Sequence, residues 1–297
     1  MSTLERMQLF GKEILVRSHT CSENGCPCEL TQPAVRIYAK VTNACNARCR
    51  FCSNWAHSER IGFDAEKFLE IVQAVEESKF NLQRVCLTGG EPSCAEETVL
   101  GILEGMVSDD LVDVPVFMST NGISASARRL MRHPRLNCVT MSLHHYDYGR
   151  LGEIYGVGGR IESFEGLGME SRKFTATCNL MKGYVDSAEE AKRMMDFALR
   201  IGCSELGFVS LMDKNAFCRE AYVDVDDLRL ENVDHLIFAS RHSGPAGCKC
   251  SNYLYVSGDR TLSVYLRDMG KNDSCESILL FDGQYLRQGF DPGDIIY

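Results

Sequence analysis

Three closely spaced cysteines are the first residues in the chain that indicate chemistry. Cys45, Cys49 and Cys52 form a C-x3-C-x2-C sequence. Three thiolates on one loop can hold three irons of a cubane 4Fe–4S cluster, which normally takes four cysteines, so the fourth iron is left open for another ligand. The alternative is a structural zinc site, but such a site wants four protein ligands and this loop offers three. The spacing therefore predicts an iron–sulfur cluster with one open position.

A glycine-rich turn follows further along the chain, after the equivalent of one βα unit. Gly89, Gly90, Glu91 and Pro92 close a short apolar run. The two glycines let the backbone approach a ligand closely, and a carboxylate with exposed carbonyl groups suits a cation. A simple turn is the alternative, and the cysteine loop upstream favours the ligand-binding interpretation.

The cysteine loop and the Gly-Gly-Glu-Pro turn together resemble the radical S-adenosylmethionine (SAM) superfamily. In that superfamily the open iron chelates the amino and carboxylate groups of SAM, and an electron from the cluster cleaves the sulfonium to give a 5′-deoxyadenosyl radical. The resemblance implies that Phe51, just before the last cysteine, packs near the adenine. It also implies that Glu91, the Gly89–Gly90 backbone and Pro92 form the element that binds the methionyl ammonium.

Polar residues at two later strand ends extend the same resemblance. Ser119 and Asn121 lie at the end of the third predicted strand, and Ser142 ends the fourth. In the family, polar residues at these strand ends contact the carboxylate and ribose of SAM. For Ser119 and Ser142, a turn hydroxyl is an equal alternative.

The stretch 174–212 resembles the fifth and sixth strands of the molybdenum-cofactor GTP cyclases. That branch of the superfamily carries a SPASM or twitch extension with an auxiliary iron–sulfur site. The resemblance implies that Asn179 lies near SAM or substrate and that the backbone near Met212 meets the adenine. The alternative for both side chains is a packing role.

The composition limits which classes of protein and which cellular locations the chain fits. The chain has 297 residues, 44% of them hydrophobic, and a formal net charge of −9. A nucleic-acid binder usually shows a basic face, and no Lys/Arg run appears, so RNA is disfavoured as a substrate. No apolar run approaches the roughly 18 residues that a membrane helix needs, and the N-terminus lacks a signal-peptide pattern. Oxidation would spoil a cluster loop among 15 cysteines, so a reducing cytoplasm is the expected location.

Alternating strand and helix signals organise the middle of the chain. Short apolar runs predict six buried parallel strands, at 35–41, 84–87, 115–119, 138–143, 174–181 and 206–212. Amphipathic segments predict helices between them, at 64–79, 97–111, 125–131, 156–169, 187–201 and 226–240. Six βα units with right-handed crossovers give an α/β fold, an open, partial (β/α)6 barrel. Active sites in such barrels gather at the carboxyl ends of the strands, which is where both motifs fall.

A polar group follows the fourth predicted strand and consists of His144, His145, Tyr146, Asp147 and Arg150. These side chains could line a substrate pocket or shuttle a proton. The alternative is a solvated loop. The pattern does not single out a catalytic residue.

The last part of the chain resembles the twitch extension of the same enzymes. Gly244-Pro245-Ala246-Gly247 predicts a hinge, and 253–264 predicts a β-hairpin that turns at 257–259. The resemblance implies that this extension holds an auxiliary 4Fe–4S cluster. The expected parts are an N-terminal cysteine-containing segment over 1–33, the radical SAM barrel over 34–243 and a C-terminal, twitch-like β extension over 244–297.

Cysteines outside the barrel are candidate ligands of that second cluster. Two C-x-C pairs flank the barrel and one more cysteine follows, so the candidates are Cys26, Cys28, Cys248, Cys250 and Cys275. The chain departs from the family pattern, in which the paired cysteines are two apart and a third follows the hairpin, where Val264 and Tyr265 stand here. A zinc site or free thiols are the alternatives.

The resemblance implies an enzyme that reduces and cleaves SAM and then abstracts a hydrogen atom from a small molecule. The electron donor would be a protein such as flavodoxin or ferredoxin, and the substrate a nucleotide, a sugar or an amino-acid-derived metabolite. The protein's part is to bind, orient and exclude side reactions. Modification of a ribosomal peptide precursor is one alternative, although the segment before the first predicted strand is too short for a peptide-recognition domain. A non-catalytic iron–sulfur sensor is another, but it would not need the Gly-Gly-Glu-Pro turn.

Overall fold

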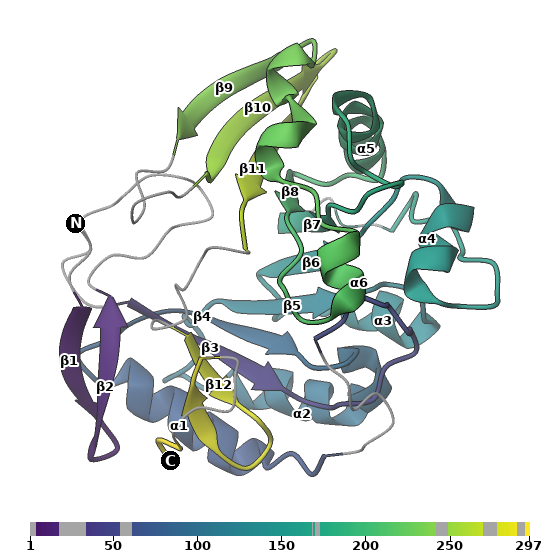
Figure 1. Cartoon of the computed structure of the whole chain (residues 1–297). Helices are drawn as coiled ribbons and strands as arrows, with labels where there is room; N and C mark the ends of the chain where they lie inside the picture. The colour runs from purple at the N-terminus through teal and green to yellow at the C-terminus, as the bar shows by residue number, and fades with distance from the viewer. Residues whose placement is uncertain are drawn as a thin grey trace.

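The computed structural model confirms the α/β prediction. It describes residues 4–17, 34–53, 61–167, 169, 173–241, 249–269, 278–289 and 295–297. Six strands pair in parallel, in chain order: β3 (Ala34–Lys40), β4 (Asn81–Thr88), β5 (Val116–Thr120), β6 (Cys138–Ser142), β7 (Lys173–Asn179) and β8 (Glu205–Val209). Among the described strands the sheet does not close on itself, so the barrel is partial, as predicted (Figure 1).

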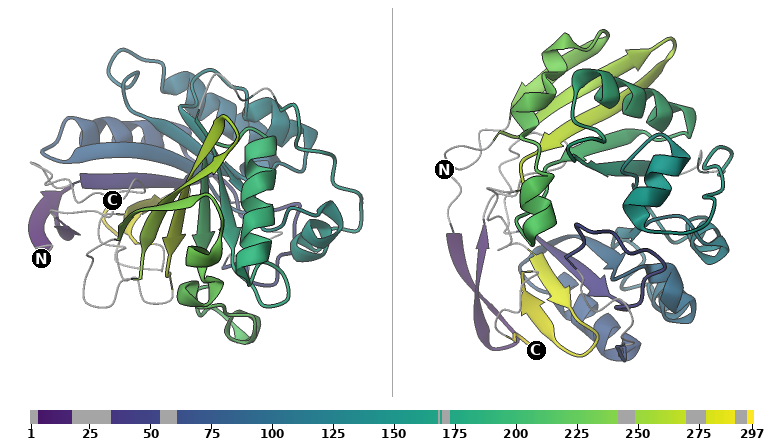
Figure 2. Two further views of the ribbon diagram at one scale, coloured as in Figure 1. Left: turned by 90° about the horizontal axis from the view of Figure 1, so that it is seen from above. Right: turned by 45° about the vertical axis from the view of Figure 1, so that its right-hand side comes forward.

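Helices in the connections lie on the outer side of the curved sheet (Figure 2). They are α1 (Ala65–Glu76), the 3-10 turn η1 (Pro92–Ala95), α2 (Glu96–Gly105), α3 (Ala125–Leu130), α4 (Tyr148–Tyr155) and α5 (Ala188–Arg200). The short α6 (Ala216–Glu220) packs instead on the loop that follows β3. The predicted caps are present, because the side chains of Asp64 and Ser187 accept hydrogen bonds from the backbone N–H groups of Lys67 and Glu190. None of the described helices has both the length and the apolar character that a membrane crossing requires.

The helix between the fourth and fifth barrel strands lies upstream of its predicted position. The helix expected at 156–169 is wrong, because the described residues of that range contain only turns and irregular chain. Helix α4 comes earlier, where Asp147 caps its start through the backbone N–H of Arg150 and Gly156 ends it with a φ of +62°. A left-handed glycine at this point stops the helix.

The predicted helix over 226–240 is also wrong. This segment forms two 3-10 turns, η2 (Val225–Leu228) and η3 (Leu230–Asn232), and then strand β9 (Leu236–Arg241). Arg229, between the turns, has a φ of +47°, which interrupts a right-handed helix. β9 pairs with a strand beyond the predicted hinge, so the β extension takes in residues on both sides of the boundary expected at 243/244.

The predicted C-terminal hairpin is confirmed and is joined to the barrel sheet. β10 (Ser251–Ser257) and β11 (Arg260–Arg267) pair antiparallel, and β11 also pairs in parallel with β8. At the opposite edge, β12 (Ile278–Phe281) pairs in parallel with β3 and antiparallel with β13 (Leu286–Gln288). The region after the barrel therefore adds a parallel strand to each edge of the six-stranded sheet, with β9–β11 at the top and β12 at the bottom of Figure 1.

A second, two-stranded sheet near the N-terminus is not among the predicted elements. It consists of β1 (Leu4–Leu9) and β2 (Lys12–Arg17). Phe10 and Gly11 connect them with φ angles of +50° and +73°, the two positive values that a type I′ hairpin turn needs. The ring of Phe10 stacks on that of Tyr297, with centroids 4.4 Å apart, so this hairpin is attached to the end of the described chain.

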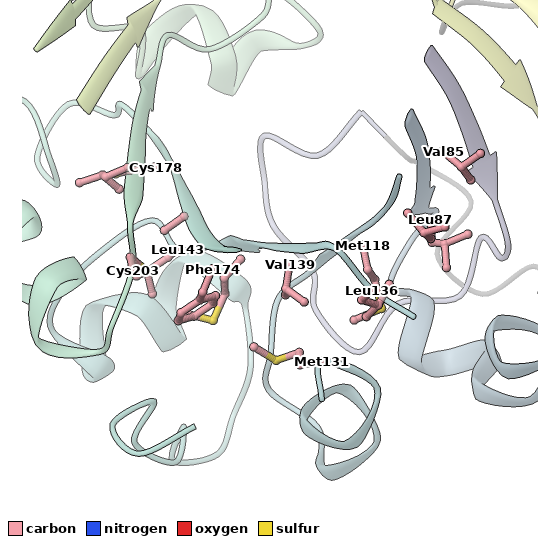
Figure 3. Close-up of a cluster of buried hydrophobic side chains, with 14 of the residues drawn as sticks. Val85, Leu87, Met118, Met131, Leu136, Val139, Leu143, Phe174, Cys178 and Cys203 are labelled. Atoms are coloured by element: carbon pink, nitrogen blue, oxygen red, sulfur yellow. The ribbon is translucent and has the colours of Figure 1, made fainter. Parts of the chain in front are cut away.

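Alternate residues along the barrel strands point to opposite sides of the sheet. On the outer side Val85, Met118, Val139 and Phe174 are at most 1% exposed and belong to one continuous apolar cluster with Met131 of the α3 segment (Figure 3). This cluster attaches the helices to the outer side. The other side of the sheet faces the barrel interior.

Candidate active site

The cysteine loop begins where β3 ends and is bound to the glycine turn that follows β4. Gly90 N donates to Thr42 O at 2.7 Å, and Glu91 N donates to Ala44 O at 2.9 Å. A side chain at Gly89 or Gly90 would overlap the backbone carbonyls of Thr42 or Ala44. The close backbone approach that these glycines allow is therefore an approach to the cysteine loop, and the two motifs form one unit.

The three thiols of this loop are half-buried. Burial raises the pKa of Cys45 to about 11 and that of Cys49 to about 12, and repulsion from the neighbouring thiolates adds to both. Ala47 N donates to Cys45 Sγ at 3.3 Å. Iron reverses the pKa shift, because a thiol that coordinates a metal is deprotonated outright. Clustered, partly buried thiols with an N–H donor fit a 4Fe–4S cluster.

A single-ion site fits less well. Among the described residues, no group of three or more His, Cys, Asp or Glu side chains comes together closely enough to hold one metal ion. A structural zinc ion needs four such ligands around one point. A cubane cluster binds each thiolate to a different iron, so neighbouring thiols that do not meet at one point suit it better.

Glu91 lies beside the loop as a buried carboxylate, with 1% of its surface exposed. It accepts hydrogen bonds from the Thr120 hydroxyl at 2.7 Å, from Asn121 N at 2.8 Å and from Ser93 N at 3.1 Å, and Pro92 beside it is buried at the start of η1. Burial raises the pKa of Glu91, and the donors offset part of that rise. All three donors are neutral groups, so a cation in reach of this carboxylate would compensate a buried charge. The position fits the predicted contact with the methionyl ammonium.

Asn121 joins the end of β5 to the cysteine loop. Its Nδ2 donates to Asn46 Oδ1 at 2.7 Å, so the side chain helps to hold the loop. Ser119, two residues earlier on β5, is half-buried. Ser142 ends β6, and its carbonyl accepts a hydrogen bond from the Tyr155 hydroxyl. All three predicted residues therefore lie at the same edge of the sheet.

Phe51 packs on the buried ring of His144, which in turn packs on Tyr155. The ring of His144 stands edge-on to that of Phe51 at a centroid distance of 4.9 Å, and the Tyr155 ring is 5.9 Å from His144. His144 Nδ1 accepts a hydrogen bond from Asn179 N at 3.1 Å, so the neutral imidazole carries its proton on Nε2. Burial lowers the pKa of His144 to about 3. The ring is therefore a neutral support for Phe51 rather than a proton carrier.

Tyr155 is a site residue that the sequence does not reveal. It ends α4, and its carbonyl accepts a hydrogen bond from Arg48 N at 2.6 Å, so the helix is attached to the cysteine loop. A Cβ on the next residue, Gly156, would lie 3.0 Å from Arg48 O. The Asp147 cap and the Gly156 stop are the signals that could have revealed α4, but they do not reveal its contact with the cysteine loop.

Two further predicted residues follow later strands. Asn179 ends β7 half-buried, where its backbone N–H is bonded to His144. Met212 lies past β8 with 37% of its surface exposed, and its carbonyl accepts from Lys214 N at 2.9 Å. Both lie at carboxyl ends of barrel strands, as predicted.

The polar group after β6 does not form one site. His144 points to Phe51, whereas His145 is buried elsewhere, with its Nε2 3.9 Å from Glu190 Oε2. Tyr146 donates to the same carboxylate at 2.8 Å, and Asp147 is the cap of α4. These residues are mostly structural, and only His144 joins the cysteine loop.

The inner face of the barrel is polar. Neighbours in register share a face, and one such row contains Ser142, Thr177, Gly207 and Tyr265. Within it the hydroxyl oxygens of Thr177 and Tyr265 are 3.5 Å apart. A side chain at Gly207 would overlap the Tyr265 ring, so the tyrosine of the extension lies across β8 towards β7.

Charge on the inner face is mostly positive. By register the charged residues of this face are the cations Arg36, Lys40, Arg84, Lys173 and Arg267 and the carboxylate Glu205. Lys173 Nζ is 3.5 Å from Glu205 Oε2, and three of the other cations lie on β3 and β4, the strands that carry the two motifs. In a chain with a net charge of −9, such a face favours an anionic molecule.

One of the predicted auxiliary ligands lies within the described residues. Cys250 is fully buried immediately before β10. The predicted ligands Cys26, Cys28, Cys248 and Cys275 lie outside the described residues.

Comparison with known proteins identifies the family. A profile of the Radical SAM superfamily matches residues 39–198, which is more than half of the chain. The chain belongs to the radical SAM superfamily. Members of this superfamily of enzymes use a 4Fe–4S cluster together with SAM, the two cofactors predicted from the cysteine loop and the Gly-Gly-Glu-Pro turn.

Curated relatives of this radical SAM chain include GTP 3′,8-cyclases. The protein from Campylobacter curvus is 34% identical over 110 residues, which cover 35% of this chain and 32% of the relative. A probable GTP 3′,8-cyclase from Thermococcus kodakarensis is 32% identical over 181 residues, or 58% of this chain and 55% of the relative. The matches thus span about half the length of these relatives or less.

Solved structures share the radical SAM fold at low sequence identity. Streptococcus suis SuiB bound to SAM has a TM-score of 0.54 and 17% identity, with 67% of this chain and 46% of SuiB covered. A radical SAM methyltransferase from Sphaerobacter thermophilus has a TM-score of 0.51 and 16% identity, with 78% and 76% covered. At these identities the likeness concerns the fold alone.

Proposed function

We propose that this protein reductively cleaves SAM and uses the resulting radical to abstract a hydrogen atom from a small, anionic substrate. The observation that carries the proposal is the union of the three-cysteine loop with the Gly-Gly-Glu turn at the carboxyl ends of parallel strands. A buried carboxylate with neutral hydrogen-bond donors lies at that junction. This combination suits a cluster that also binds the amino acid part of SAM.

In this proposal Cys45, Cys49 and Cys52 hold the cluster and leave one iron for the amino and carboxylate groups of SAM. When bound, this pair supplies one-electron cleavage of SAM to a 5′-deoxyadenosyl radical. Glu91 binds the methionyl ammonium through charge-assisted hydrogen bonds, each worth about 1.5–3 kcal/mol. Phe51 packs near the adenine.

The remaining residues orient the ligand and exclude water. His144 packs against Phe51 and is itself packed against Tyr155. Ser119, Ser142 and Asn179, at neighbouring strand ends, are the proposed polar contacts of SAM, joined by Asn121 and by the backbone at Met212. Exclusion of water from this end of the barrel would prevent side reactions of the radical.

An anionic small molecule, such as a nucleotide, is the proposed substrate class. The three cations on the inner face of β3 and β4 support an anionic group. The names of the curated relatives, which act on GTP, make nucleotides the first compounds to test. A flavodoxin or ferredoxin is the proposed electron donor.

A second 4Fe–4S cluster in the extension over 244–297 is a separate part of the proposal. Its candidate ligands are Cys248, Cys250 and Cys275, with Cys26 and Cys28 from the segment over 1–33. The burial of Cys250 next to β10 is compatible with a ligand that is shielded from solvent.

The test is SAM cleavage by the anaerobically reconstituted protein with dithionite as reductant. Wild type should yield 5′-deoxyadenosine, measured by chromatography. The triple variant Cys45→Ala/Cys49→Ala/Cys52→Ala should yield none, because no thiolate remains to hold the irons. Cys203→Ala, which removes a buried thiol beyond the end of α5, is the matched control and should keep most of the activity.

Two results would contradict the proposal. Product formation by the triple variant would show that the loop does not hold the reactive cluster. The second is a wild-type protein that binds zinc in place of iron on this loop and forms no 5′-deoxyadenosine, which would show that the loop is a structural zinc site.

A further inference from the structure

The outer side of the cysteine loop carries two exposed arginines. Arg48 and Arg50 stand between the proposed cluster ligands, and both are exposed. The guanidinium of Arg48 donates to Cys45 O at 2.6 Å and to Ala47 O at 2.8 Å, so it lies along the loop. The guanidinium of Arg50 lies 4.2 Å from the centre of the Phe217 ring. Both charges are therefore fixed at the surface beside the thiols.

Helix α6 packs on this side of the loop, in front of it in Figure 1. Asn215 Nδ2, at the start of the helix, donates to Arg50 O at 3.0 Å. Cys218 Sγ, in its middle, is 3.8 Å from Phe51 O. The helix and the loop thus form one continuous surface.

The α6 segment adds to the positive charge of that surface. Lys214 precedes the helix and Arg219 is exposed near its end. Asp213 pairs with Arg219 at 2.7 Å, and Glu220 is the other acid of the segment. We call Arg48, Arg50, Lys214 and Arg219 the loop-side patch. Four cations and two carboxylates give this surface a net charge of +2, on a chain whose total is −9.

The patch adjoins the loop that carries the proposed cluster ligands. Cys45, Cys49 and Cys52 are only half-buried, and Arg48 and Arg50 alternate with them along the loop. A protein that docks on this surface would therefore lie beside the half-buried thiols of the loop.

We propose that the loop-side patch is the docking surface for an acidic one-electron carrier protein. This inference rests on the proposed function, which requires a reductant. Encounters between redox partners bury small interfaces, and complementary charge raises their association rates by about 10- to 1,000-fold at low ionic strength. In the docked pair the reduced carrier loses one electron and the cluster gains it, with no proton or atom transferred.

The patch is tested by the rate at which a reduced, acidic flavodoxin reduces the reconstituted cluster. Stopped-flow absorbance follows oxidation of the flavodoxin and needs neither SAM nor substrate. In the Lys214→Gln/Arg219→Gln variant we expect the second-order rate at low salt to fall about tenfold, since charge steering is lost. Arg50→Gln should lower this rate by a similar factor. The wild-type rate should also fall as salt is raised, because salt screens the same charges.

Two controls make the result specific. Reduction by the methyl viologen radical cation, which is too small to need a docking surface, should be unchanged in both variants. Lys79→Gln removes an exposed charge just before the amino end of β4, whereas the cysteine loop lies at the carboxyl ends of the strands. This variant should be reduced by both reductants at the wild-type rates. Arg48 is not substituted, because its guanidinium supports the loop carbonyls.

Equal flavodoxin rates in wild type and in the Lys214→Gln/Arg219→Gln variant would overturn the proposal. So would equal losses with flavodoxin and with viologen, which would indicate damage to the cluster rather than to docking. If wild type accepts electrons from flavodoxin through the patch but forms no 5′-deoxyadenosine, the docking surface stands and the proposed SAM chemistry fails.

Discussion

At the scale of single residues, His144 and Glu91 are the two buried titratable groups next to the cysteine loop. Glu91 accepts three hydrogen bonds, and His144 is bonded to Asn179 N and packed on Phe51. They differ in what would compensate their charge. A cationic ligand can neutralise Glu91, whereas an imidazolium at His144 would face two aromatic rings and a backbone donor.

His144 should therefore make the fold sensitive to mild acid. Its folded-state pKa of about 3 lies below the value of about 6.5 in an unfolded chain, so the unfolded chain binds a proton that the folded one does not. The stabilisation is complete above pH 6.5 and is lost as the pH falls below it. At pH 5 the loss is about 2 kcal/mol relative to pH 7, measured by urea unfolding of the cluster-free, reduced protein.

The matched comparison uses two histidine variants. His144→Gln should make the fall between pH 7 and pH 5 shallower, because one titrating group is gone, while His145, whose pKa burial also lowers, remains. His235→Gln, at an exposed position, should keep the wild-type slope. Equal slopes in wild type and His144→Gln would contradict the buried, neutral assignment.

At the scale of elements, β11 is attached to the barrel by a contact that only glycine permits. Tyr265 lies over Gly207, near the Thr177 hydroxyl and under the Arg267 guanidinium, which is 4.7 Å from the ring centre. The extension thus supplies part of the inner wall of the barrel. At this register the chain has an aromatic contact between Tyr265 and β8.

Gly207→Ala should be destabilising, since its methyl group overlaps the Tyr265 ring. Overpacking of this kind costs about 1–3 kcal/mol, which chemical denaturation would measure. Adding Tyr265→Ala should remove most of the further cost of Gly207→Ala. Gly101→Ala is the control, because a methyl group there meets nothing within 4 Å and a helical alanine is favoured by about 1 kcal/mol.

Short-range signals explain which elements could be predicted from the sequence. The six barrel strands and the helices capped by Asp64 and Ser187 depend on local patterns, and they were located to within a few residues. Helix α4 was missed because its residues are mostly polar or glycine. β9 was read as a helix because its partner strand lies beyond the hinge, and a single segment does not reveal a distant partner.

The site residues also differ in whether they lie in a short motif or depend on contacts between distant segments. The three cysteines and Glu91 could be proposed as site residues because each lies in a short motif. Tyr155 could not, since its contact with the cysteine loop exists only after α4 has packed against β6 and the loop. The pairing of β11 with β8 and of β12 with β3 likewise joins segments whose sequences contain no sign of one another.

At the scale of the whole molecule, the proposed second cluster predicts iron that the barrel loop does not hold. The variant Cys45→Ala/Cys49→Ala/Cys52→Ala should retain about four irons and four sulfides per chain, one cubane, measured by colorimetric assay. Replacing Cys248 and Cys250 with alanine in wild type should lower the iron content by the same amount while SAM cleavage persists. A triple variant without iron would leave the extension without a cluster, and bound zinc would favour a structural site.

The two parallel strands that flank the barrel have a consequence for the newly made chain. Residues 34–209 leave the ribosome before β11 and β12, so β3 and β8 first emerge with unpaired edges, which are sites for aggregation. The cysteine loop follows β3, one of those edges, and β12 pairs there only after residue 281 has been made. The newly made barrel therefore passes through an interval in which the strand that leads into the cysteine loop has no partner on its outer edge, until synthesis of β12 completes the sheet.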